Sequence, residues 1–364
     1  QQIWHHDASG YYLGLFWSGM PDLNYANPAV TEAMLEVARY WLVEMNADGF
    51  RLDAIKHLIE AGRLTENTPA THDWLNGFYD FYKSVDPQAL AVGEAWTSTQ
   101  QVMDYTGDEV DIAFQFDLAA GLVNSAKVGI GSLFARPMAE VAAAFPPGQY
   151  ATFTTNHDQD RLMSQLDGDV GAAKVAASYL LTAPGVPFIY YGEEIGMLGR
   201  KPDEDIRRPM QWSAAAGAGF TAGTAWRPPA QDYLARNVAA QTAEPDSLLS
   251  HYRALIGLRN RHPALRLGAW LPVEAEPGRV YACLRQLEGE TLLVVINPGR
   301  EAVSDYALNL AAGPLRGENL MTAVFGGQEV SKLPELTEAG GWRDYRPLDT
   351  LPPQSTFIWL FQPV

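Results

Sequence analysis

The sequence predicts an α/β fold, a parallel sheet wrapped by helices, followed by an all-β domain. Over residues 26–265, short apolar segments alternate with amphipathic helical patterns, as expected for parallel strands that are buried on both faces. After about residue 266, short alternating runs are separated by Gly and Pro turns and show no helical periodicity, which favours a small β-sandwich. The chain has 364 residues, more than the roughly 250–300 that one hydrophobic core usually supports, so two domains are expected.

The first helix is predicted over residues 26–45, where apolar residues recur at three-to-four spacing. Asn27 is the expected N-cap, and Pro28 suits the first helical position. Five strand–helix units should follow, with strands in GFRLD, ALAVGEAW, DIAFQFDL, YATFTTNH and VPFIYYGEE. The helices of these units are expected in THDWLNGFYDFYKSV, STQQVMDYTG, LFARPMAEVAAAF, VGAAKVAASYLLTA and SLLSHYRALIGLRNRHPAL. A long insertion, roughly residues 196–246, separates the last strand from its helix.

Composition narrows the function classes. The formal net charge of −17 at pH 7 gives a surface that repels phosphate groups, so nucleic acid and acidic membranes are poor partners. Cys283 is the only cysteine, which permits no disulfide within the chain. The longest apolar stretches are interrupted by Gly and Pro and fall short of the roughly 20 residues of a membrane span. A folded enzyme or binding protein fits these properties.

Three carboxylates stand at the ends of predicted strands. Asp53 ends GFRLD, Glu94 follows AVG, and Asp158 follows TTNH. Because loops at the carboxyl ends of parallel strands carry the chemistry of α/β barrels, we expect the three acids to converge at one rim. Any one of them alone is more often a helix cap or one half of a loop ion pair. Three together, with Arg51 and His157 beside them, favour a catalytic site.

Glycoside cleavage is a reaction that needs such a set of acids. A retaining mechanism uses one ionised carboxylate as nucleophile and one protonated carboxyl as acid and then base, roughly 5–5.5 Å apart. Asp53 suits the first role, because Arg51 on the same strand face would hold it ionised. Glu94 suits the second role, because the apolar neighbours in AVGEAW would favour its protonated form.

Further polar residues around the three acids are expected to contact the sugar. His157 and Asp158 would grip sugar hydroxyls, whereas Lys56 and His57 lie just beyond the nucleophile, where the leaving sugar would sit. Trp96 directly follows the acid/base residue and is either a sugar-stacking platform or a core residue. The charged run GFRLDAIKH is thus interpreted as part of a catalytic mouth.

These motifs resemble the α-amylase family of retaining α-glucan enzymes. The stretches GFRLDAIKH, GEAW and TTNHD are similar to the family's regions around the nucleophile, the acid/base and the transition-state stabiliser. MPDLN resembles a short family motif in a form intermediate between the oligo-1,6-glucosidase and neopullulanase branches. GVPFIYYGEEIGM resembles the eighth barrel strand, and the end of the chain resembles the family's C-terminal β-domain.

The resemblance implies roles for individual residues and a fold. Asp53 would be the nucleophile, Glu94 the acid/base and Asp158 the acid that holds the ring hydroxyls, with Arg51 and His157 in the same subsite. The fold would be of the (β/α)8 TIM-barrel type with strands 4–8 only. The predicted regions are 1–25 as the end of an inserted domain or linker, 26–265 as the C-terminal part of the barrel, and 266–364 as a C-terminal β-sandwich.

The chain also departs from the family pattern. A further family region, with an Asp and a closing Asn-His pair, has no match in this sequence, and neither do strands one to three of the barrel. A five-stranded barrel would leave open edges. The sequence is therefore expected to be part of a longer protein whose N-terminal portion was removed or is a separate chain, which would make activity of this chain alone doubtful.

The resemblance implies a metal, a substrate loop and a compartment as well. A structural calcium ion would be bound by the backbone carbonyl of His57, and no organic cofactor is expected. KPDEDIRRPMQW resembles a substrate loop after the eighth strand, in which Asp205 and Arg208 would touch sugars on the non-reducing side; a salt-bridged loop is nearly as well supported. Secretion from a bacterium is expected from polymeric substrates, although the sequence shows no signal peptide pattern.

Three functions remain open from the sequence. The leading hypothesis is hydrolysis of internal α-1,4 bonds of starch-like α-glucan, a polysaccharide or oligosaccharide, with retention. An exo-acting α-glucosidase, an oligo-1,6-glucosidase or a transglycosylase would use the same three acids and differ in pocket shape. A non-catalytic barrel acting as a binding subunit is a remote alternative, because it would not need Asp53, Glu94 and Asp158.

Overall fold

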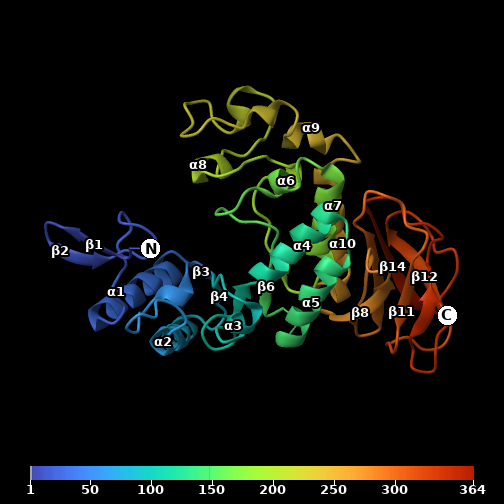
Figure 1. The fold of residues 1–364 in the computed structure, drawn as a ribbon, viewed down its shortest axis with the longest axis horizontal. Helices are drawn as coiled ribbons and strands as arrows, with labels where there is room; N and C mark the ends of the chain where they lie inside the picture. The colour runs from blue at the N-terminus through green and yellow to red at the C-terminus, as the bar shows by residue number, and fades with distance from the viewer. Residues whose placement is uncertain (1, 147) are drawn as a thin grey trace. The chain divides into compact units, whose positions relative to one another are not determined.

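The computed structural model describes residues 2–146 and 148–364, and their contacts divide the chain into two units (Figure 1). Unit 1 comprises Gln1–Thr97 and Asp104–Ala113, and unit 2 comprises Ser98–Met103 and Phe114–Val364. Gln1 and Pro147 fall in the first and second predicted regions and lie outside the described residues. The predicted division into three regions follows similarity rather than contacts, and it stays a prediction.

Unit 1 begins with an antiparallel hairpin and continues with alternating helices and strands. The hairpin pairs β1 (Trp4–Asp7) with β2 (Gly10–Leu13). Helix α1 (Pro28–Arg39) starts as predicted, because the Asn27 side chain accepts a hydrogen bond from the backbone N–H of Ala29. The remaining elements are a π-helical turn (Tyr40–Glu44), β3 (Gly49–Leu52), a 3₁₀ turn (Ile55–His57), α2 (Pro69–Val85), β4 (Leu90–Gly93) and β5 (Ile112–Phe114).

The parallel strands of unit 1 end level with one another. In β3 and β4, Gly49 lies opposite Leu90 and Leu52 lies opposite Gly93. In the next pair, Gly93 lies opposite Ala113 of β5. Because β3 and β4 stop at paired residues, the next residue on each strand, Asp53 and Glu94, emerges at the same edge of the sheet.

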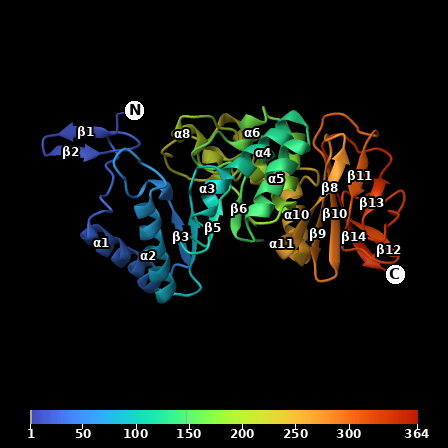
Figure 2. The same cartoon turned by 60° about the horizontal axis from the view of Figure 1, so that its bottom comes forward.

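The helical part of unit 2 contains the two remaining parallel strands. Ala151 of β6 (Tyr150–Thr152) lies opposite Val186 of β7 (Val186–Pro187). Helices α4, α5, α7 and α10 pack against one another (Figures 1 and 2). The helices before the insertion are α3 (Thr99–Met103), α4 (Phe116–Val128), α5 (Ser132–Ala144), α6 (Leu162–Gln165) and α7 (Val170–Thr182); α10 (Leu248–Arg261) and α11 (Pro263–Leu267) follow it.

Several predicted strands are shorter than expected, and two of them, β5 and β7, end where other structure begins. The strand expected in DIAFQFDL ends at Phe114, and α4 begins at Phe116, whose side chain joins a buried cluster with Ala119 and Phe153. The strand expected in VPFIYYGEE is reduced to Val186–Pro187, and its polar end forms a 3₁₀ turn (Glu193–Ile195). In both places packing of the large apolar residues, rather than the alternation along the chain, decides where the strand ends.

The insertion between β7 and α10 is built mainly from loops and short helical turns. Its elements are α8 (Asp203–Ile206), 3₁₀ turns at Ala216–Gly219 and Gln231–Leu234, and α9 (Val238–Thr242). A small buried cluster of Ile195, Met197, Met210 and Leu249 packs it onto the start of α10. This cluster anchors the insertion to the helical part of unit 2.

Unit 2 ends in a seven-stranded antiparallel sheet with the order β12-β14-β10-β9-β8-β11-β13 (Figure 2). Strand β8 pairs with β9 through its first half and with β11 through its second half. All seven strands contribute side chains to one buried core, which includes Trp342 and Trp359. The strands are β8 (Ala269–Glu276), β9 (Tyr281–Leu287), β10 (Glu290–Asn297), β11 (Ala307–Leu310), β12 (Asn319–Phe325), β13 (Trp342–Tyr345) and β14 (Ser355–Pro363).

The predicted fold class is confirmed. Parallel strands that alternate with helices occupy the region before α11, and only antiparallel strands follow from Ala269 onward. Within the described residues, no helix is both long enough and apolar enough to cross a membrane.

Candidate active site

Asp53 and Glu94 are brought together by the paired ends of β3 and β4. One guanidinium group contacts both: Nη1 of Arg51 donates to Oδ1 of Asp53 at 2.5 Å, and Nη2 donates to Oε2 of Glu94. Backbone hydrogen bonds continue the ladder past the strands, from Glu94 N–H to Leu52 C=O at 2.9 Å and from Ile55 N–H to Glu94 C=O at 3.1 Å. The two carboxylates therefore face a common cation from adjacent strands.

The two acids differ sharply in exposure. The side chain of Asp53 is 73% exposed, whereas that of Glu94 is 12% exposed. Val92 and Ala95, on either side of Gly93 and Glu94, are buried, whereas Trp96 is 51% exposed. An accessible carboxylate and a sheltered carboxyl are the two environments that a nucleophile and a general acid require.

The backbone directly after Asp53 is unusual. Ala54 has φ 45° and ψ 40°, the left-handed region that residues other than glycine, asparagine and aspartate seldom occupy. The 3₁₀ turn Ile55–His57 begins there, so the chain leaves β3 sharply. Backbone of this kind often occurs at functional sites, where it fixes the direction of a neighbouring side chain.

A cavity of about 370 Å³ adjoins this corner of unit 1. Arg51 and Asp53 line it together with large apolar side chains, among them Trp41 and Phe50. The combination of one charged pair with aromatic walls fits an amphipathic ligand.

Lys56 and His57 are held by the loop that follows the 3₁₀ turn. Nζ of Lys56 lies 2.6 Å from Oε2 of Glu66, and Nδ1 of His57 lies 2.7 Å from the carbonyl oxygen of Thr65. Their side chains are only 16% and 17% exposed. The structure thus gives both residues a role in fixing the loop, and their predicted contact with a leaving sugar stays a prediction.

Asp158 lies in unit 2, in the loop after β6, and it has a cation of its own. Its Oδ1 accepts from Nη2 of Arg207 at 2.7 Å, and its Oδ2 lies 3.2 Å from Nε2 of His157. Nε of Arg207 also donates to the carbonyl oxygen of His157 at 2.9 Å, and the Asp158 N–H donates to Oδ1 of Asn156 at 2.9 Å. The carboxylate is thereby fixed on two sides.

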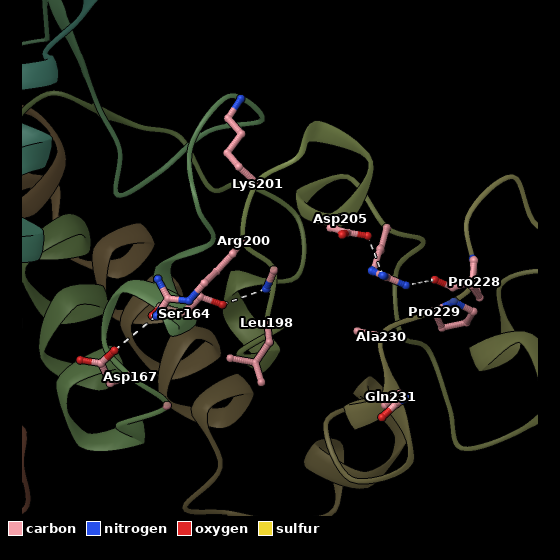
Figure 3. Close-up of a pocket in the computed structure, with 13 residues that line it drawn as sticks. Ser164, Asp167, Leu198, Arg200, Lys201, Asp205, Pro228, Pro229, Ala230 and Gln231 are labelled. Atoms are coloured by element: carbon pink, nitrogen blue, oxygen red, sulfur yellow. Dashed lines mark hydrogen bonds and ion pairs between the residues drawn. The ribbon is translucent and has the colours of Figure 1, made fainter.

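Arg207 is a residue that the sequence reasoning missed. That reasoning chose Arg208 from KPDEDIRRPMQW, yet Nη2 of Arg208 donates to Oδ1 of Asp205 at 2.6 Å (Figure 3). The same Oδ1 accepts from Nε and Nη2 of Arg227 at 2.9 and 2.7 Å. These bonds lower the pKa of Asp205, the Arg227 hydrogen bond most. The salt-bridged loop left open by the sequence is present, and sugar contact by Asp205 and Arg208 stays a prediction.

A calcium ion at the His57 carbonyl would need further oxygen ligands. Calcium takes six to eight oxygen ligands. Within residues 2–146 and 148–364, no group of three or more His, Cys, Asp or Glu is arranged to hold a metal ion. Glu66, the acid paired with His57, is hydrogen-bonded to Lys56. The calcium ion at the His57 carbonyl stays a prediction.

Comparison with known proteins fits this geometry. Residues 1–268 match the family described as alpha amylase, catalytic domain. The chain belongs to the α-amylase family. It is 34% identical over 311 residues to Alpha-amylase 3 of Dictyoglomus thermophilum, covering 82% of this chain and 59% of that protein. It is also 34% identical over 347 residues to trehalose synthase/amylase TreS of Mycobacterium tuberculosis, covering 80% of this chain and 57% of that protein.

A solved structure shows the same architecture. The alpha-amylase from H. orenii superposes with a TM-score of 0.81 at 33% identity, covering 99% of this chain and 70% of that one. The chain spans a little under three fifths of the two curated relatives that it matches. The family and the fold class inferred from the motifs are confirmed, and the exact substrate differs among family members.

Proposed function

We propose that the protein to which this chain belongs hydrolyses α-1,4 bonds of starch-like glucans with retention of configuration. The observation that carries the proposal is the contact of one Arg51 guanidinium with both Asp53 and Glu94, from paired strand ends. Two carboxylates that share one cation can flank a single glycosidic bond. We further propose that cleavage occurs at internal bonds of the polymer.

The proposed reaction has two displacements. In the first, the Asp53 carboxylate attacks the anomeric carbon while Glu94 gives its proton to the glycosidic oxygen, so that the C–O bond to the leaving sugar breaks and a glycosyl ester forms. In the second, Glu94 takes a proton from water, the water oxygen attacks the same carbon, and the ester bond to Asp53 breaks. The role expected for Asp158, which is to hold ring hydroxyls, stays a prediction.

Arg51 and the difference in exposure distinguish the two acids in this scheme. The Arg51 guanidinium contacts both carboxyl groups, and such a contact suits the attacking carboxylate but not the proton donor. Glu94 is the more sheltered of the two, so binding of a sugar over this corner removes water from it further and favours its protonated form. In this scheme Arg51 then keeps its ion pair with Asp53, the nucleophile, and loses its ion pair with Glu94.

The test compares Asp53→Asn and Glu94→Gln with Asp73→Asn, which changes an exposed acid of α2. Loss of the nucleophile or of general acid catalysis is expected to lower kcat by roughly 10²–10⁴-fold or more. NMR of the first products should show the α-anomer, as retention requires. Unchanged hydrolysis by Glu94→Gln, or β-anomeric first products, would contradict the proposal.

A second experiment separates the alternatives that share the three acids. The protein is incubated with starch and, separately, with a short maltooligosaccharide, and the product sizes are followed over time. Early mixtures of several short maltooligosaccharides favour cleavage inside the polymer, whereas early glucose alone favours an exo-acting α-glucosidase. Products longer than the starting oligosaccharide indicate a transglycosylase.

A further inference from the structure

Glu193 is a buried acid that the proposed chemistry does not use. It is 3% exposed and begins the 3₁₀ turn Glu193–Ile195 that follows β7. A carboxyl group in such a place needs hydrogen-bond partners, because burying an unpaired polar group costs free energy. The partners of Glu193 therefore show which parts of the fold it connects.

Two hydroxyl groups from different elements meet the Glu193 carboxyl group. The Thr154 hydroxyl donates to Oε2 at 2.5 Å, and the Tyr252 hydroxyl, on α10, donates to Oε1 at 3.0 Å. Thr154 and Tyr252 are 2% and 1% exposed, so bulk water does not compete for either hydrogen bond. Glu193 thus joins the loop after β6 to α10 through buried hydrogen bonds.

Thr154 anchors the start of the loop after β6. The strand ends at Thr152, whose carbonyl oxygen still accepts from the Phe188 N–H at 2.7 Å. Within residues 2–146 and 148–364, the hydroxyl oxygens of Thr152 and Thr155 are buried without a hydrogen-bond partner. In this described stretch, Thr154 is therefore the threonine whose hydroxyl ties the loop to another element.

The same loop carries His157 and Asp158 a few residues further on. Arg207 holds that end of the loop, through the His157 carbonyl oxygen at 2.9 Å and Oδ1 of Asp158 at 2.7 Å. The side chains of Arg207 and Asp158 are 37% and 35% exposed, whereas the hydrogen bond between Thr154 and Glu193 is buried. Functional groups act only when held within about 0.5 Å of their working position, so both contacts bear on where Asp158 lies.

We propose that Glu193 is a positioning residue for Asp158, because through Thr154 it fixes the start of the loop on which Asp158 lies. The inference rests on the proposed function, since it takes Asp158 to hold ring hydroxyls of the sugar. Glu193 itself does not touch the substrate in this assignment, because its carboxyl group is buried against two hydroxyls of the protein. Losing this contact should therefore affect catalysis through Asp158.

The test compares Thr154→Val with Thr182→Val in the protein to which this chain belongs. Both threonines are buried in unit 2, and the Thr182 hydroxyl donates to the Ser178 carbonyl oxygen of its own helix, α7, at 2.6 Å. We expect Thr154→Val to lower kcat/KM for starch about tenfold, because a misplaced group loses part of its effect, and Thr182→Val to leave it unchanged. Thr154→Ser keeps a hydroxyl and should restore most of the activity.

A second comparison separates positioning from loss of stability. Thr154→Val is repeated in the Asp158→Asn background, where we expect no further fall in kcat/KM, because two residues that act as a unit are not additive. A purely structural loss would lower the activity by the same factor in both backgrounds and would overturn the inference. Equal kcat/KM for Thr154→Val and Thr182→Val would overturn it as well.

Variants of Glu193 test the acid itself. Burial raises the pKa of Glu193 to about 8, so near pH 7 the group mostly carries a proton, and the neutral amide of Glu193→Gln resembles it. We expect Glu193→Gln to keep most of kcat/KM, and Glu193→Leu to show the same fall as Thr154→Val. A folded Glu193→Leu variant with unchanged kcat/KM overturns the inference while leaving the proposed function intact. If the parent protein neither binds nor hydrolyses α-glucans, the proposed function fails, and the inference falls with it.

Discussion

Asp53 in unit 1 and Asp158 in unit 2 are each paired with an arginine, but the two pairs are formed by different kinds of structure. Each places a carboxylate against an arginine, but Arg51 lies two residues before Asp53, whereas Arg207 lies 49 residues after Asp158. The first pair needs only the strand β3 and its register with β4. The pair of Arg207 and Asp158 forms only because the insertion that carries Arg207 folds back onto the loop after β6. A charge pair within one strand can therefore be predicted from residue spacing, whereas a charge pair between two distant loops cannot.

The largest effect is expected from breaking the locally encoded pair. Arg51→Met removes one guanidinium group that contacts both the Asp53 and the Glu94 carboxylates. Losing one hydrogen-bonded partner of a desolvated charge pair costs about 2–5 kcal/mol, which predicts a fall in kcat/KM of roughly 30- to several thousand-fold. Arg39→Met, which changes an exposed arginine at the end of α1, is the control. Equal rates for both variants would remove Arg51 from the site.

The second prediction concerns the pH dependence of stability, to which a buried acid in each unit contributes. Burial raises the pKa of Glu193 in unit 2 to about 8 and that of Glu109 in unit 1 to about 7, from an ordinary value of 4.5. An acid with a raised folded-state pKa contributes its full stability below pH 4.5 and loses it as pH rises through the folded-state pKa. The free energy of unfolding should therefore fall between pH 5 and 8.

The measurement is urea unfolding at pH 5.5 and 8.5. Glu193→Gln keeps one acceptor oxygen for the hydroxyl of Thr154 or Tyr252 and offers an NH2 donor to the other hydroxyl oxygen; it should remove on the order of 3 kcal/mol of the pH-dependent loss. Glu109→Gln, in contact with Nδ1 of His72, should remove on the order of 2 kcal/mol and act on unit 1. If neither variant flattens the pH dependence, other groups control it.

The smallest effect is expected from the pair that the loop brings together. Arg207→Met removes the cation from Asp158, but both side chains are about one third exposed, so water compensates part of the loss. We expect kcat/KM to fall about tenfold, equivalent to about 1.4 kcal/mol. Arg208→Met removes the neighbouring cation, which contacts Asp205 instead, and should have a smaller effect. A larger loss for Arg208→Met would reverse the assignment and favour the original sequence-based choice.

The sequence predicted secondary structure correctly where the spacing of apolar residues matches the faces that are buried in the structure. The helix cap at Asn27, the parallel strands β3 and β4 and the antiparallel end of the chain follow from spacing of apolar residues, because secondary structure buries one face or both. It overestimated β5 and β7, where runs of apolar residues look like strands but pack as a helix start and a loop. In such short apolar runs, the spacing of apolar residues does not distinguish a strand from the start of a helix or from a loop.

The sequence by itself determined the family, the alternation of strands and helices, and the pairing of Arg51 with Asp53, because residues two apart on a strand share a face. Only the tertiary structure decided that Arg51 also contacts Glu94, that Arg207 rather than Arg208 meets Asp158, and that three aromatic rings of the insertion line one pocket with Tyr191. Those contacts join residues distant in the chain, and which of two adjacent arginines turns toward an acid depends on loop backbone that no periodic pattern specifies.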